Sequence, residues 1–96
     1  MQPIQALGMA WFYEDDYEAF RSVLPDRSWH RTFHEWEAAA EKGMQRIRDQ
    51  GGRPVKAKAR STEFIAWCAA AGHHVDAKAL TAFAAEVARR EIVGSH

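Results

Sequence analysis

Apolar positions recur three or four residues apart between Thr32 and Gln50, the longest periodic segment of the chain. That spacing places them on one stripe of an α-helix, which has 3.6 residues per turn. Thr32 and Glu35 have the spacing of a capping box, in which the two side chains bond free backbone N–H groups at a helix start. Gly51 and Gly52 then end the segment. The pattern predicts one long helix, with an apolar stripe made of Phe33, Trp36, Ala40, Met44 and Ile47.

Two short segments have the pattern of strands. The aromatic-rich residues at about 9–13 predict the first strand. Residues 55–60 alternate strictly between apolar and basic side chains, as in a strand with one buried face. This second strand is expected to bury its apolar face and to carry a basic outer face formed by Lys56, Lys58 and Arg60.

Three more helices are expected, over residues 17–24, 62–71 and from 77 to near 94. Ser61 and Asp76 are the expected N-caps of the last two, and Gly72 is the expected C-cap of the helix over 62–71. The order β-α-α-β-α-α predicts an α+β class, mainly helical, in which four helices cover two short strands. The pair of helices between the strands sends the chain out and back. We therefore expect antiparallel strands, with a parallel crossover as the alternative.

The length of 96 residues suits a single compact domain, residues 1–96. The one cysteine excludes an internal disulfide and favours a reducing compartment. No apolar run reaches the roughly 18 residues of a membrane span, and the first residues lack the pattern of a secretory signal. These features predict a cytoplasmic protein that does not enter a membrane.

The neutral total charge hides a basic block. Residues 42–60 carry seven bases against one acid, whereas residues 1–41 carry eight acids against three bases. The basic block is a candidate for contacting nucleic-acid phosphates. Three structural explanations compete: cations favour the carboxyl end of a helix, charges protect an edge strand, and the acidic block can neutralise the basic one. The candidate binding residues are Arg46, Arg48, Arg53, Lys56, Lys58 and Arg60.

The sequence evidence for catalytic or metal-binding residues is weaker than that for the basic block. Cys68 could act as a nucleophile, but it falls on the apolar side of a predicted helix and is better explained as a buried hydrophobe. The acids of residues 14–18 lack the spacing of a calcium loop and suit helix capping. We predict no metal, no cofactor and no catalytic residue. The weak metal candidate combines His30 and His34 with Cys68 or with His73 and His74.

The four tryptophans raise the possibility of a protein interface. We expect three of them to be buried and Trp29 to be partly exposed, as an aromatic anchor. An open strand edge could also accept a partner strand, so the protein is expected to be a monomer or a homodimer through an edge strand. The favoured function is a small non-enzymatic binding or adaptor domain of unknown protein partner. The alternative is a nucleic-acid-binding accessory protein that uses the basic face of residues 46–60.

Several segments together resemble a family of short bacterial proteins to which no activity is assigned. The resemblance covers most of the chain and rests on caps and core aromatics, so it implies a bacterial single-domain protein and names no reaction. The segments are residues 10–17, 34–36, 38–42, 63–68, 76–79 and 83–84.

Overall fold

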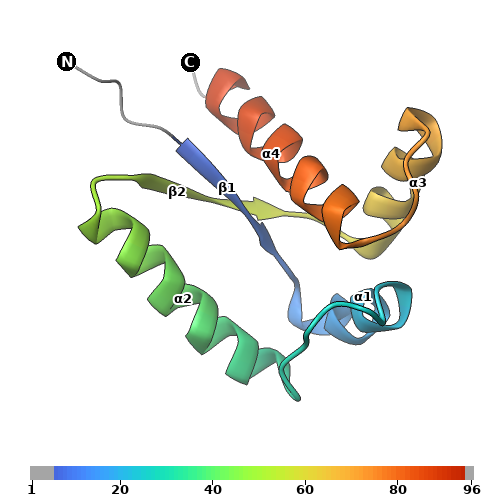
Figure 1. Cartoon of the computed structure of the whole chain (residues 1–96), viewed down its shortest axis with the longest axis horizontal. Helices are drawn as coiled ribbons and strands as arrows, with labels where there is room; N and C mark the ends of the chain where they lie inside the picture. The colour runs from blue at the N-terminus through green and yellow to red at the C-terminus, as the bar shows by residue number, and fades with distance from the viewer. Residues whose placement is uncertain (1–5, 95–96) are drawn as a thin grey trace.

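The computed structural model describes residues 6–94, and within that range four α-helices and one short 3-10 helix surround a two-stranded sheet. The class is α+β and mainly helical, as predicted (Figure 1). None of the described helices is long and apolar enough to cross a membrane. In chain order the elements are β1 (Ala6–Trp11), η1 (Glu14–Asp16), α1 (Tyr17–Val23), α2 (Phe33–Asp49), β2 (Arg53–Lys58), α3 (Ser61–Ala71) and α4 (Ala77–Gly94).

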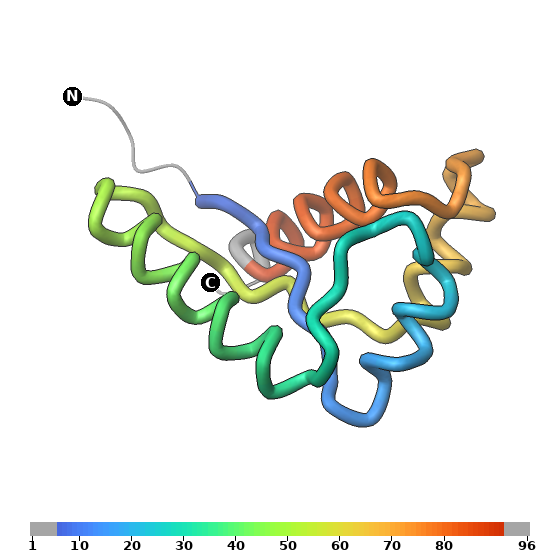
Figure 2. Tube along the Cα trace, turned by 60° about the horizontal axis from the view of Figure 1, so that its bottom comes forward, coloured from blue at the N-terminus to red at the C-terminus, as the bar shows by residue number. Residues whose placement is uncertain are grey.

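The two strands run parallel, so the expected antiparallel pairing is wrong. Both strands also begin and end two or three residues earlier than the predicted ranges of about 9–13 and 55–60. The prediction assumed that the two helices between the strands have similar lengths, so that one leads away from the sheet and the other leads back. However, α1 has 7 residues and is about 10 Å long, against about 26 Å for the 17 residues of α2. Only α2 therefore runs back along the sheet. It returns the chain to the end where β1 begins, and β2 starts with Arg53 beside Ala6 (Figure 2).

The sheet lies between α2 on one face and α4 on the other (Figure 1). Successive strand residues point to opposite faces. Trp11 of β1 points toward α2, where its ring centroid lies 4.9 Å from that of Trp36. Gly8 points toward α4, since a Cβ added there would lie 2.6 Å from the carbonyl oxygen of Ala84 and 2.8 Å from Cβ of Ala88. The missing side chain of Gly8 lets α4 pack directly on the strand.

Aromatic side chains fill the end of the sheet where β1 finishes. The ring of Phe12, directly after β1, has its centroid 4.8 Å from those of both Phe20 and Trp36. Phe64 of α3 lies 5.9 Å from Phe20 of α1 and 5.6 Å from Phe83 of α4, centroid to centroid. Aromatic pairs at such spacings each contribute about 0.5–1.5 kcal/mol beyond their burial. These contacts fix α1 and α3 against the carboxyl end of the sheet.

Three predicted helix ends are confirmed. The hydroxyl of Thr32 accepts a hydrogen bond of 3.1 Å from the backbone N–H of Glu35 at the start of α2. Gly72 ends α3 in the left-handed conformation, with φ of 73°. A carboxylate oxygen of Asp76 accepts a hydrogen bond of 2.8 Å from the backbone N–H of Ala79 in the first turn of α4. These local signals set helix limits because the bonds lie within a few residues.

The start of α3 differs from the prediction, because Ser61 is its first residue and not its cap. The N-cap residue is Arg60, and the carboxylate of Asp16, from another part of the chain, bonds the first residue of the helix. It accepts hydrogen bonds from the Ser61 backbone N–H at 2.6 Å and from the Ser61 hydroxyl at 2.9 Å. The side chain of Asp16 makes no capping bond to α1, the helix that it precedes in sequence. The acidic segment thus connects two helices that are distant in the sequence.

Candidate binding groove at the open edge of β1

In the described part of the chain, one edge of β1 is unpaired and forms the floor of a groove. Gly8, Met9 and Ala10 all line the same cavity. Consecutive strand residues point to opposite faces, so three in a row can line one cavity only where it runs along the edge of the strand. β2 covers the other edge of β1. The cavity therefore lies where a third strand would add to the sheet.

The backbone groups of Gly8 and Ala10 face this groove. The carbonyl of Trp11 accepts a hydrogen bond of 3.4 Å from the backbone N–H of Ala59, which places Trp11 among the residues whose backbone groups point toward β2. Backbone groups of successive strand residues alternate between the two edges. The N–H and C=O groups of Gly8 and Ala10 consequently point away from β2. They form the ladder that an incoming strand would use.

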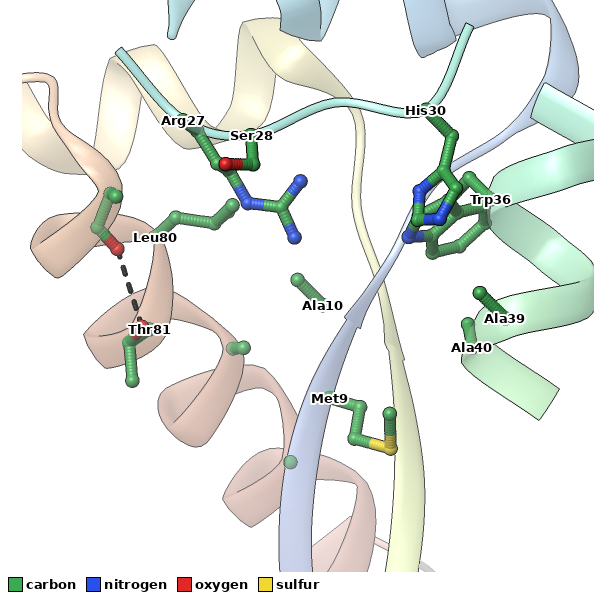
Figure 3. A pocket seen from close by; sticks show the side chains of 13 residues that line it. Met9, Ala10, Arg27, Ser28, His30, Trp36, Ala39, Ala40, Leu80 and Thr81 are labelled. Atoms are coloured by element: carbon green, nitrogen blue, oxygen red, sulfur yellow. Dashed lines mark hydrogen bonds between the residues drawn. The ribbon is translucent and has the colours of Figure 1, made fainter. Parts of the chain in front are cut away.

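The two helices on either side of the sheet form the walls of the groove. Its volume is about 430 Å³, which falls within the range of roughly 300–1,000 Å³ for ligand pockets. Figure 3 shows the α2 wall on one side and the α4 wall on the other, with β1 between them. The walls are apolar apart from one hydroxyl. They consist of Trp36, Ala39 and Ala40 from α2, and Ala77, Leu80, Thr81 and Ala84 from α4.

The loop between α1 and α2 closes one end of the groove with Arg27, Ser28 and His30 (Figure 3). Two hydrogen bonds hold this loop in place. The indole N–H of Trp29 donates to the carbonyl of Leu24 at 2.7 Å, and the phenol of buried Tyr17 donates to the carbonyl of His30 at 2.8 Å. Burial raises the pKa of Tyr17, so its phenol stays protonated and keeps this donor.

Arg27 is the half-buried cation of the groove. Its guanidinium carbon lies 4.6 Å from the ring centroid of Trp29 and 5.3 Å from that of Phe12. Burial lowers the pKa of Arg27, which reflects the cost of holding a charge away from water. No carboxylate of the described residues lies within 4 Å of it, whereas Arg21 pairs with Glu18 at 3.0 Å. The aromatic rings orient the guanidinium but do not neutralise it.

The six predicted binding cations lie on α2, on β2 and directly before α3. Arg46 and Arg48 are exposed near the end of α2, and two residues apart on a helix they point in different directions. Arg53 and Lys58 are exposed at opposite ends of β2.

The other two predicted binding cations have partners within the fold. Lys56 is half-buried and faces α2, with its ammonium 3.0 Å from the carboxylate of Glu41 and 4.4 Å from the ring centroid of Trp11. The guanidinium of Arg60 lies 2.7 Å from the carboxylate of Asp15. The predicted alternation of the strand is confirmed, but its basic side is partly covered by α2. For Arg60, the acidic segment neutralises the basic one, as one of the structural explanations held.

Two tryptophans are buried, Trp11 and Trp36, whereas Trp29 and Trp67 are half-buried, so one more is accessible than we expected. The ring of Trp29 packs 5.2 Å from Phe12, centroid to centroid. Its position supports the loop that carries Arg27. A role for Trp29 as an anchor for a partner stays a prediction.

The other candidates for chemistry have structural roles. Among residues 6–94 no cluster of three or more His, Cys, Asp or Glu could hold a metal ion. Cys68 is buried, and burial first, then the nearby charge of Asp76, raise the pKa of its thiol. A thiol held in its protonated form is a poor nucleophile. Glu14 lies 3.2 Å from His34, so the acids of residues 14–18 serve as partners of other side chains.

Comparisons with known proteins give no match to a family model, to a curated protein or to a solved structure. The resemblance to short bacterial proteins therefore stays a prediction, and the functional assignment rests on the groove itself.

Proposed function

We propose that this protein is a small non-enzymatic binding domain that accepts an extended peptide segment of a partner protein along the open edge of β1. The observation that carries the proposal is the unpaired edge of Gly8–Ala10 on the floor of a groove between two helices. A peptide added as a strand gains backbone hydrogen bonds from such an edge, and the walls accept its alternate side chains.

The composition of the groove supports binding and not catalysis. The described residues that line it include no Cys, Asp or Glu, and their titratable side chains are those of Arg27 and His30. The small side chains of Ala39, Ala40 and Ala84 leave room beside the strand without exposing a large apolar surface. The single buried cysteine suits a reducing compartment, and we propose the cytoplasm as the location.

The nucleic-acid alternative has less support, because Lys56 and Arg60 already pair with carboxylates. A short DNA duplex at low salt tests it directly. Amide NMR shifts confined to residues 46–60 that fade with added salt would favour the alternative over the groove.

The proposed function is tested by NMR titration of the labelled protein with a pool of N-acetylated random hexapeptides. We expect amide shifts at residues 8–10 and on the facing sides of α2 and α4. Ala39→Trp fills the groove from an exposed position and should abolish the shifts, whereas Ala38→Trp is exposed one residue away, outside the groove lining, and should retain them. Shifts elsewhere, or equal effects of the two variants, would contradict the proposal.

A second copy of the chain is the competing occupant of the edge. Light scattering of the free protein distinguishes it. A stable dimer whose β1 amides are protected from hydrogen exchange would mean that the edge serves self-association, while a monomer leaves the edge available to a peptide.

A further inference from the structure

The groove has a polarity, because its two ends differ in charge. Arg27 and His30 close the end at which β1 finishes, and Arg27 sits beside the ring of Phe12, the residue after the strand (Figure 3). Among residues 6–94, no titratable side chain lines the groove beside Gly8, toward the beginning of β1. Within the described lining, a peptide lying along β1 therefore meets Arg27 at the end where β1 finishes and no charged side chain at the other end.

Arg27 is available to an anion without breaking an existing ion pair. Some arginines of the described chain already form ion pairs, such as Arg21 with Glu18 at 3.0 Å. The arginines near the end of α2 and at the start of β2 form none within residues 6–94, but they are exposed and lie outside the lining of the groove. The guanidinium of Arg27 lies against the rings of Trp29 and Phe12, which hold it in the groove. A half-buried cation without a counter-ion gains more from an arriving carboxylate than an exposed one, since less water must be displaced.

Chain direction then decides which end of a peptide reaches Arg27. A strand antiparallel to β1 would bring its amino end, and a free ammonium there would be repelled. A strand parallel to β1 brings its carboxyl end, and it also extends the parallel pairing of β1 with β2. The planar guanidinium suits a carboxylate because it offers paired N–H donors.

We infer that the groove binds the free carboxyl terminus of a partner protein as a third parallel strand, with its terminal carboxylate on Arg27 and apolar side chains against α2 and α4. This rests on the proposed function and adds the class of ligand. Side chains of the bound strand alternate between the Trp36 wall and the Leu80 wall, both apolar. The last few residues of the partner are therefore apolar and without lysine or arginine.

The test compares two pools of N-acetylated hexapeptides with leucine, isoleucine or valine at the last position, one pool with a free carboxyl terminus and one amidated. Binding is followed by NMR shifts of the amides of residues 8–10. We expect the free pool to bind at least about 10-fold more tightly, the effect of one lost charge-assisted hydrogen bond.

The Arg27→Gln variant should bind the two pools equally, whereas Arg21→Gln, an arginine of α1 with its own acidic partner, should keep the preference. Because the readout is a ratio of affinities, a general loss of stability cannot imitate it. Arg27→Lys keeps the charge and should keep part of the preference.

Three outcomes are decisive. Equal binding of both pools at residues 8–10 would overturn the carboxylate inference and leave the groove as a peptide site. Binding of neither pool there would remove the proposed function as well. A preference for the free pool that Arg27→Gln does not change would overturn the role of Arg27.

Discussion

Substituting alanine for Gly8 tests the central packing of the fold. The added Cβ would meet the carbonyl oxygen of Ala84 at 2.6 Å and Cβ of Ala88 at 2.8 Å. Favourable contacts between such atoms lie near 3.5–4.0 Å, so α4 would have to shift by roughly 1 Å. One of the two atoms is backbone within a helix and cannot rotate aside. The whole helix must move, and its buried contacts with the sheet loosen.

The expected loss can be set against an opposing gain. Overpacking of this kind costs about 1–3 kcal/mol, and a site blocked by helix backbone belongs at the upper end. Replacing glycine in a strand recovers about 0.5–1 kcal/mol from the unfolded chain. The cost of overpacking exceeds the gain from the unfolded chain, and we expect Gly8→Ala to lower the free energy of unfolding by about 2 kcal/mol.

Gly43→Ala is the matched control. Gly43 lies inside α2, and a Cβ there would touch only Cε of Met9, at an ordinary 3.7 Å. Alanine in a helix interior is favoured over glycine by about 1 kcal/mol, so this variant should be more stable than the parent protein. Urea unfolding followed by far-ultraviolet circular dichroism measures both. A Gly8→Ala protein as stable as the parent would show that α4 does not pack on β1 as described.

Three further predictions concern the helix ends and the thiol. Asp16→Asn should lower the free energy of unfolding by about 1–2 kcal/mol, because a carboxylate accepting two hydrogen bonds becomes an amide. The control Asp15→Asn changes an exposed carboxylate and should cost less than about 1 kcal/mol. Equal effects of the two variants would contradict the role of Asp16 at the start of α3. Thr32→Ala should cost about 1 kcal/mol through the lost cap of α2, measured by the same urea titration. Cys68 should react slowly with a thiol reagent at neutral pH in the native protein and rapidly in denaturant, since its raised pKa and burial both disfavour the thiolate; rapid native labelling would refute the buried position.

Sequence patterns predicted the features that depend on near neighbours. Thr32, Gly72 and Asp76 set helix ends through bonds to residues at most four positions away. Strand direction depends instead on whether a helix lies along the sheet or across its end. Here the strands are parallel because the long α2 lies along the sheet and the short α1 does not, and this placement is visible only in the packed structure.

The groove could not be predicted for a related reason. Its lining comes from β1, α2, α4 and the loop of Arg27, four segments that are brought together only by the parallel crossover. In the sequence Arg27 belonged to a linker, and nothing nearby marked it as unpaired. The basic block, by contrast, was conspicuous as a run of charges, yet the partner of Lys56 is Glu41, fifteen positions earlier. Charge patterns show which cations exist but not which are already neutralised.

The contact between Gly8 and α4 also bears on how the chain folds. It joins the first strand to the last helix of the described residues, and β1 itself pairs with β2, whose partner residues lie 47 positions later in the sequence. Contacts between residues so far apart in sequence require large loops to close before they contribute to stability. Although mainly helical, the chain should therefore fold at rates typical of mixed α/β domains and not at those of helical bundles. Until α4 packs on the sheet, the face of β1 that carries Gly8 and Ala10 stays exposed to water and to other chains.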